Sequence, residues 1–312
     1  MKISVVTTLY YSEKYLLEFY QRIKAAVIQI SPDYEIVFVN DGSPDSSGKA
    51  VLDLQKNDDR IVLIQLSRNF GHHQAILTGL KHCEGEYIFL IDSDLEEDPE
   101  LIVQFWNEKK RSNDIDVVFG EQIKRKGDIL ERSSGTLFYK ILNTLTQFDY
   151  PANTLTARLM TKKYVKAVLE YTEKTLDVWA IFVMAGFNQV GIPVTKKSKG
   201  TSTYTFLRKL KMSLEIITSL SHRPLYLIFI LGLIWLFISG GYVVAILIQK
   251  WIYGSQIEGW ASIMASLWLI GGIIIFLLGV IGIYLSKIFL EIKDRPLTII
   301  KSIHRSGNEG TI

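Results

Sequence analysis

The sequence predicts an α/β domain in the first 200 residues, followed by a helical membrane part. Short runs rich in Val and Ile alternate with helix-like segments through residues 1–200. This alternation is typical of a parallel sheet covered by helices on both faces. Two long runs without a charged residue follow at residues 225–248 and 260–286. The 312-residue chain is 48% hydrophobic and 21% charged, so disordered, collagen-like and disulfide-rich classes are excluded.

Five buried strands are expected in the α/β domain. They are 3–9, 34–40, 61–66, 87–91 and 116–120. Residues 12–30 and 71–82 fit helices between them. Ligands of such sheets bind beyond the carboxyl ends of the strands, so the polar residues that follow each strand are the first candidates for a site.

The two uncharged runs are each longer than the roughly 20 residues that a helix needs to cross a bilayer. Glycines in both runs would let two helices approach closely as a transmembrane hairpin. Lys and Arg are frequent before the first run and after the second, whereas Lys250 is the one base near the connecting loop. Both termini and the α/β domain are therefore expected on the cytoplasmic side of the plasma (inner) membrane, in a multi-pass protein.

The segment before the first run, residues 201–223, has apolar residues largely at helical spacing and several bases between them. This pattern indicates an amphipathic helix at the membrane surface, with a helix packed on the soluble domain as the alternative. The expected organisation is thus a cytoplasmic domain at 1–200, the amphipathic helix at 201–223, two transmembrane helices within 224–288 and a cytoplasmic tail at 289–312.

Charge and cysteine content narrow the function further. The net charge of +3 is too small to indicate a nucleic-acid partner. Cys83 is the single cysteine, so no internal disulfide is expected, and the residue is interpreted as an inert small hydrophobic side chain.

Two acidic turns follow expected strands. Asp41 lies in the first, at 40–45, and Asp92, Asp94 and Glu96 lie in the second. Alternate carboxylates offer oxygen ligands of the kind that Mg²⁺ or Mn²⁺ takes beside nucleotide phosphates. A D-x-D triplet is a weak signal by itself, and a second one at 114–116 precedes its strand and is interpreted as solvated surface. Neither a G-x-G-x-x-G nor a G-x-x-x-x-G-K-[ST] loop is present in the sequence.

Basic residues could receive an anionic substrate, because guanidinium groups bind phosphate in a fixed fork. The candidates are Lys124, Arg125, Lys126, Arg132 and Arg158. Taken singly, each is better explained as a solvated charge. His72 and His73 have no neighbouring Cys or carboxylate at ligand spacing, so a structural or supporting role is expected.

These motifs together resemble those of inverting family 2 glycosyltransferases that act on polyprenyl phosphates, of the dolichyl-phosphate mannose synthase and bactoprenyl glucosyltransferase kind. The matching segments are 3–6, 39–43 (V-N-D-G-S), 67–71 (S-R-N-F-G), 92–95 (D-S-D-L), 137–139, 158–160 (R-L-M) and 295–297, combined with two C-terminal apolar spans. The resemblance implies a GT-A fold, a Rossmann-like domain that binds a nucleotide sugar. It also implies a Mg²⁺ or Mn²⁺ ion, a polyprenyl (undecaprenyl) phosphate acceptor, a UDP-sugar donor that is glucose-like, and a homo-oligomer such as a tetramer.

The resemblance also implies site residues, position by position. Those expected at the nucleotide sugar are Tyr10, Asp41, Ser43, Arg68 and Asp92. Those expected at the acceptor phosphate are Arg125, Arg132, Ser134 and Arg158. Asp94 and Glu96 would bind the metal, and Asp92, Asp94 and Arg132 would serve catalysis. Thr8 and Tyr11 replace the Pro and Asn common in the first loop, and Gln122 stands where Arg is often found, which bears on donor identity.

The expected product is a polyprenyl-phosphate sugar for surface polysaccharide or O-antigen modification. Two alternatives stay open. A processive polysaccharide synthase of the same fold is disfavoured because the sequence has no Q-x-x-R-W motif. A non-catalytic membrane adaptor of a lipid-sugar flipping complex would have lost its carboxylates, whereas Asp41, Asp92 and Asp94 are all present.

Overall fold

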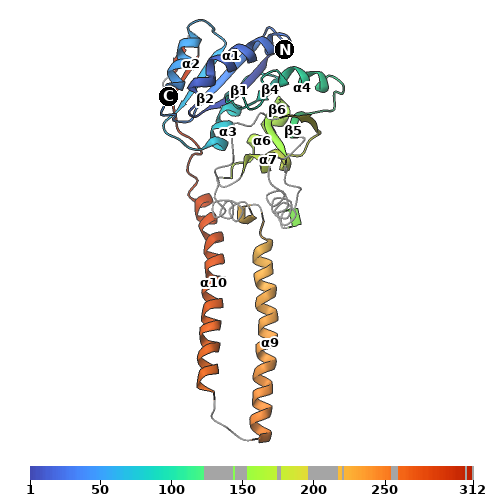
Figure 1. Cartoon of the computed structure of the whole chain (residues 1–312), viewed down its shortest axis with the longest axis vertical. Coiled ribbons are helices and arrows are strands. Elements are labelled where there is room, and N and C mark those ends of the chain that lie inside the picture. Colours follow the sequence, from blue (N-terminus) through green and yellow to red (C-terminus); the bar gives the residue numbers. More distant parts are fainter. Residues whose placement is uncertain are drawn as a thin grey trace.

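The computed structural model describes residues 1–122, 143–144, 153–173, 177–195, 217–219, 221–253, 259–305 and 308–310. Within them, nine strands form one sheet, and two long helices extend together from one end of this sheet domain (Figure 1). The strands are β1 Ile3–Leu9, β2 Tyr34–Asn40, β3 Ile61–Leu66, β4 Tyr87–Leu90, β5 Val117–Gln122, β6 Thr154–Thr161, β7 Gln189–Val194, β8 Ile300–Arg305 and β9 Asn308–Gly310. They lie in the order β7-β5-β6-β4-β1-β2-β3-β8-β9.

Helices cover both faces of the sheet because its central strands are apolar on both sides. Helices α1 (Glu13–Ile28), α2 (Ser47–Gln55) and α4 (Leu101–Lys109) pack on one face, where Phe19, Val51 and Phe105 join the buried core. Helices α3 (His72–His82), α6 (Lys162–Leu169) and α7 (Val178–Met184) pack on the other. This confirms the expected α/β class and the five expected strands, with bounds that differ by at most two residues.

The expected parallel pairing is confirmed for β4, β1, β2 and β3, but the sheet as a whole is mixed. Strand β6 runs antiparallel to both β4 and β5, and β8 runs antiparallel to β3. The sequence around β6 does not look like a buried strand because Thr154, Thr156 and Arg158 alternate with its apolar residues. These three side chains lie on the face that α3, α6 and α7 cover.

The position of β1 fixes where a ligand can bind. Strand β1 pairs in parallel with β2 on one side and with β4 on the other. The chain therefore changes direction along the sheet at β1 and β4, and their carboxyl ends form a topological switch point. The turn that contains Asp92 follows β4 at this edge.

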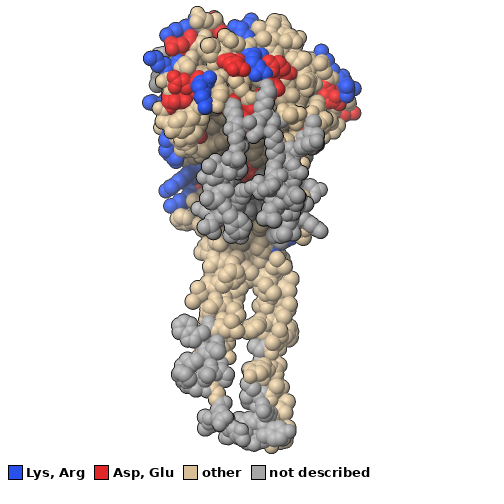
Figure 2. All heavy atoms as spheres, viewed as in Figure 1, with Lys and Arg blue, Asp and Glu red and all other residues tan. Residues whose placement is uncertain are grey.

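The two uncharged runs form helices α9 (Arg223–Tyr253) and α10 (Trp260–Ile292). Among the described residues, one segment, Leu269–Ile292, is long and apolar enough to cross a membrane, and Arg223–Trp235 is a shorter apolar helix. Figure 2 shows charged side chains gathered over the sheet domain and other residues along the helices. One span is thus supported by length and composition, whereas a two-span hairpin is not confirmed. The expected amphipathic helix at 201–223 lies largely outside the described residues.

The chain returns from α10 to the sheet, which the sequence did not lead us to expect. Strand β8 pairs with β3, and Gln55 at the end of α2 donates a 3.0 Å hydrogen bond to the His304 carbonyl on β8. Arg305 on β8 hydrogen-bonds to Glu84 Oε1 and to the His82 carbonyl. Within the segment expected as a cytoplasmic tail at 289–312, the described strands β8 and β9 therefore belong to the sheet and attach α10 to it.

Candidate active site at the switch point

Asp92 is held from two sides at the end of β4. Thr156 Oγ1 on β6 donates a 2.7 Å hydrogen bond to Asp92 Oδ2. His72 Nε2, at the start of α3, lies 3.5 Å from Asp92 Oδ1, and His72 Nδ1 is 3.1 Å from Thr8 Oγ1 on β1. Side chains from β6 and α3 thus contact this carboxylate, and Thr8 on β1 contacts His72 in turn, as expected for a site at the switch point.

The acidic turn after Asp92 is fixed by its own hydrogen bonds. The Glu96 amide donates to Asp94 Oδ1 at 2.9 Å. Glu97, which is 1% exposed, accepts the amides of Thr156 and Ala157 at 3.0 and 2.6 Å. The buried Glu97 carboxylate therefore attaches the turn to β6, close to the Thr156 hydroxyl that orients Asp92.

A metal at this turn would have few protein ligands. Within the described residues, no three His, Cys, Asp or Glu side chains form a group that could hold an ion. Asp94 and Glu96 are partly exposed carboxylates two residues apart. That donor set fits Mg²⁺ or Mn²⁺, which bind through one or two carboxylates and complete their coordination with water and substrate phosphates.

Asp41 is buried and both its oxygens accept backbone N–H groups. Oδ1 accepts the Phe70 amide at 2.7 Å and Oδ2 accepts the Gly71 amide at 3.0 Å. Burial raises the pKa of Asp41 against the opposing effect of these two hydrogen bonds. Gly42 has φ +61°, and a Cβ there would lie 2.5 Å from the Arg68 carbonyl carbon, so glycine lets the two loops meet. Asp41 therefore holds the loop after β3 beside the loop after β2.

The other residues expected at the nucleotide lie at the rim of these loops. Tyr10 is 50% exposed and Tyr11 is 60% exposed, with their rings edge to face at 4.8 Å. Ser43 Oγ accepts the Tyr11 amide at 2.8 Å and donates to an oxygen of Asp45. Arg68 is exposed, and its guanidinium lies 4.0 Å above the Phe70 ring. The structure thus brings the expected nucleotide residues together on the loops after β1, β2 and β3.

Arg158, expected at the acceptor phosphate, is 2% exposed. Its guanidinium lies 3.8 Å from the Phe182 ring centroid and 4.8 Å from that of Trp179. It donates long hydrogen bonds to the carbonyls of Thr156 and Leu155, at 3.4 and 3.3 Å, and burial lowers its pKa to about 10. The other expected acceptor residues, Arg125, Arg132 and Ser134, lie outside the described residues.

His73 adds a second histidine–carboxylate pair. His73 Nδ1 lies 3.5 Å from Asp177 Oδ1, at the N-terminus of α7. Burial lowers the pKa of His73, which favours the neutral imidazole at neutral pH. Thr156 and Asp177 were not among the expected site residues, because each contacts the site from a strand or helix that lies far away in sequence. Glu97 lies within the expected acidic turn, but its contacts were not expected because they are made to the distant strand β6.

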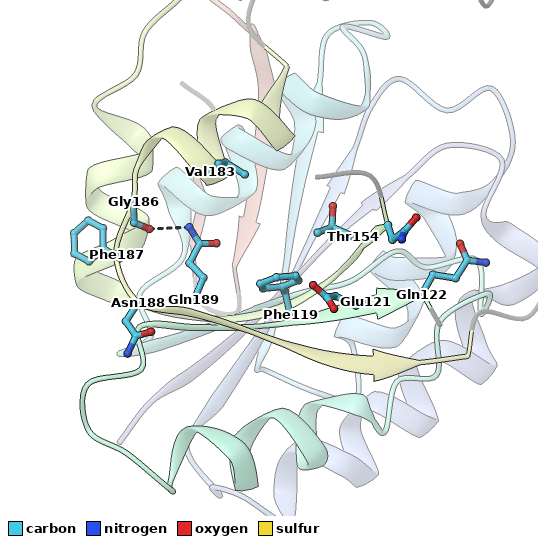
Figure 3. Close-up of a pocket in the computed structure, with 10 residues that line it drawn as sticks. Phe119, Glu121, Gln122, Thr154, Val183, Gly186, Phe187, Asn188 and Gln189 are labelled. Atoms are coloured by element: carbon cyan, nitrogen blue, oxygen red, sulfur yellow. Dashed lines mark hydrogen bonds between the residues drawn. The ribbon is translucent and has the colours of Figure 1, made fainter. Parts of the chain in front are cut away.

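A pocket of about 580 Å³ opens beside this site on the face that carries α7 (Figure 3). Phe119 and Glu121 on β5, Thr154 on β6 and Gln189 on β7 line it, together with the turn after α7. Thr154 is two residues from Thr156 on the same face of β6, so the pocket adjoins the Asp92 site.

The chain is similar to known glycosyltransferases along most of its length. A Mycobacterium tuberculosis protein named as a glycosyltransferase is 45% identical over 98% of this chain and 89% of that protein. The SfII prophage-derived bactoprenol glucosyl transferase of Shigella flexneri is 30% identical over 99% of this chain and 100% of that protein. The solved structure of residues 1–349 of S. aureus TarS in complex with UDP-GlcNAc is 19% identical, with a TM-score of 0.45 over 70% of this chain and 66% of that chain.

The family match covers the sheet domain from β1 to the end of α6. Residues 4–169 match the family described as glycosyl transferase family 2. Those residues include both acidic turns and the Thr156 position. The chain belongs to glycosyl transferase family 2.

Proposed function

We propose that this protein is a membrane-bound transferase that moves a sugar from a nucleotide sugar to a polyprenyl phosphate such as undecaprenyl phosphate. The observation that carries the proposal is the placement of Asp92 and Asp94 at the switch point, beside the loops that contain Tyr10, Asp41 and Arg68. The similarity to a bactoprenol glucosyl transferase over the whole chain supports the acceptor class. A UDP-sugar with a glucose-like ring is the proposed donor.

The chemistry requires positioning and charge more than a strong base. A polyprenyl phosphate is ionised at neutral pH, so its oxygen can attack the anomeric carbon directly. The bond from that carbon to the nucleoside diphosphate breaks as the new bond forms, and in-line attack inverts the anomeric configuration. The task of the chain is to hold donor and acceptor in line, which is the source of much of the rate in such displacements.

The described residues suit this task. The Thr156 and His72 contacts fix Asp92 beside the position proposed for the diphosphate. Asp94 and Glu96 would hold a Mg²⁺ or Mn²⁺ ion, which when bound supplies Lewis-acid stabilisation of the negative charge on the leaving group. Arg125, Arg132, Ser134 and Arg158 are proposed to hold the acceptor phosphate.

The membrane part is proposed to keep the site close to the lipid headgroup. We infer that α9 and α10 both cross the bilayer, with the sheet domain and both termini in the cytoplasm. Lys and Arg flank the pair of helices on the sheet-domain side, as the positive-inside rule requires. Attachment of α10 through β8 then limits how far the sheet domain can move from the membrane.

The test is nucleotide release by the purified full-length protein in detergent, with undecaprenyl phosphate, Mg²⁺ or Mn²⁺ and a panel of nucleotide sugars. Release that requires one donor, the lipid and the metal is expected, and Asp94→Asn should abolish it. Asp114→Asn, at the exposed first position of the second D-x-D triplet, is the matched control and should retain it. Full activity of Asp94→Asn would remove the main support for the proposal, and folded protein that is silent with every donor would favour the adaptor alternative.

A further inference from the structure

The pocket of Figure 3 is lined by several polar side chains. Among the described residues, no hydrogen bond or ion pair engages the side chains of Glu121, Gln122, Asn153, Thr154 and Asn188. Gln189 Nε2 donates to the carbonyls of Phe182 and Gly186, both at 2.7 Å, which leaves its Oε1 as an acceptor. The pocket therefore presents a carboxylate, several amides and a hydroxyl around the ring of Phe119 (Figure 3).

Glu121 is placed in this pocket by the strands on either side of it. It lies directly opposite Thr154 in the register of β5 and β6. On the other side its carboxylate lies against the backbone of Gly191 on β7, where an added Cβ would be 2.5 Å from Glu121 Cδ. Glycine at this position thus makes room for the carboxylate, and the Glu121 side chain lies in the pocket next to Thr154 (Figure 3).

The order of groups along the sheet indicates what enters the pocket. Tyr10, Asp41 and Arg68 follow β1, β2 and β3, the Asp92 turn follows β4, and Thr154 and Glu121 lie on β6 and β5. The groups of a nucleotide sugar follow a matching order, since its diphosphate lies between the nucleoside and the sugar. A donor with its nucleoside over β1–β3 and its diphosphate at Asp92 therefore directs its sugar toward β6 and β5.

We propose that this pocket binds the sugar ring of the donor and that Glu121 accepts hydrogen bonds from its hydroxyl groups. The inference rests on the proposed function only for its nucleotide-sugar donor. A pocket of about 580 Å³ lies within the usual range for small-molecule sites. Hydrogen bonds from neutral hydroxyls to a carboxylate are among the stronger ones, so Glu121 would discriminate between sugars that differ in hydroxyl configuration.

The experiment compares binding of a nucleotide with binding of its sugar derivative, by titration calorimetry on the full-length protein in detergent. The probes are UDP and GDP alone, then UDP-glucose, UDP-N-acetylglucosamine and GDP-mannose. Glu121→Gln is expected to weaken binding of the preferred nucleotide sugar about tenfold or more and to leave binding of the bare nucleotide unchanged. Gly191→Ala keeps the charge of Glu121 but displaces its carboxylate. This variant should likewise bind the nucleotide sugar more weakly and the bare nucleotide as well as the wild type does.

Glu170→Gln is the matched control, because the Glu170 side chain is exposed, has no partner among the described residues and lies outside the pocket. The proposal is overturned if Glu121→Gln binds nucleotide sugars as the wild type does, or if it loses nucleotide and nucleotide sugar equally. If the wild-type protein binds none of the probes, both the proposed donor class and the assignment of this pocket are contradicted. Wild-type protein that binds a nucleotide sugar but transfers nothing to undecaprenyl phosphate would contradict the proposed acceptor and leave the pocket assignment standing.

Discussion

The Thr156 hydroxyl on β6 donates a 2.7 Å hydrogen bond to Oδ2 of Asp92 at the end of β4. The two residues are 64 positions apart in sequence and meet because β6 inserts antiparallel beside β4. The same segment of β6 is held by Glu97, which accepts the amides of Thr156 and Ala157. Three hydrogen bonds therefore join the acidic turn to β6, and the orientation of Asp92 depends on a strand outside the D-x-D motif.

Removing the Thr156 hydroxyl should impair transfer more than folding. In Thr156→Val, Asp92 Oδ2 loses its donor, and we expect kcat for nucleotide release to fall about tenfold, since such a hydrogen bond contributes on the order of 1–2 kcal/mol. Thr156→Ser keeps the hydroxyl and should retain most activity. Release assays with thermal unfolding on both variants test this, and a Thr156→Val enzyme with wild-type kcat would show that this contact does not position Asp92.

Tyr11 has the left-handed backbone angle φ 54°, which is unfavourable for a tyrosine. Its amide is fixed by Ser43 Oγ at 2.8 Å, and its ring is largely exposed. Asn tolerates this conformation better, so Tyr11→Asn should raise the free energy of unfolding by about 0.5–1 kcal/mol. Thermal unfolding measures the effect, with Tyr10→Asn as a control that should show no gain. A lower melting temperature for Tyr11→Asn would mean that ring contacts outweigh the backbone strain.

The local part of the site could be predicted from sequence because it follows apolar strands directly. Asp41 and Asp92 come just after β2 and β4, and the strand bounds at 3–9 and 34–40 match the structure. Parallel neighbours then bring these strand ends to one edge, as the switch-point rule requires. Predicting these residues did not require knowledge of contacts between segments that are distant in sequence.

The contacts from β6, β8 and α7 could not be predicted in the same way. Thr156 and Arg158 make β6 resemble a polar segment, since their side chains face the site and the aromatic rings of α7 rather than an apolar core. Strand β8 follows an apolar helix and reaches the sheet through pairing with β3, which no local pattern encodes. Both depend on pairings between segments distant in sequence, which a propensity for strand does not specify.

Attachment of the C-terminal strand should weaken in acid. Glu84 accepts hydrogen bonds from Lys2 and Arg305, and these lower its pKa from 4.5 to about 2, the Lys2 bond having the largest effect. The pKa is depressed in the folded state, so the stabilisation is full above about pH 4.5 and is lost as the pH falls toward 2. Because Glu84 is half exposed, we expect a contribution of about 1 kcal/mol.

Glu84→Gln tests this dependence. Its melting temperature should lie below that of the wild type near pH 6, and the difference should narrow as the pH approaches about 3. Glu170→Gln, which changes an exposed carboxyl without a partner among the described residues, should match the wild type throughout. A gap that stays constant with pH would show that Glu84 stabilises the fold by packing and not by charge.

Membrane topology can be tested with single cysteines, because the native thiol is a poor target. Burial raises the pKa of Cys83 to about 12, so at neutral pH the thiolate that reacts with maleimides is scarce. If α9 and α10 both cross the bilayer, Ser255→Cys, between the two helices in sequence, should react with a membrane-impermeant maleimide in intact cells. Asn113→Cys, exposed on the sheet domain, should react only after lysis.

Labelling of both positions only after lysis would place the connection between the helices on the cytoplasmic side and exclude the two-span hairpin. Labelling of neither position in the lysate would show that the thiols are covered, in which case position 253 or 259 at the helix ends provides the same comparison.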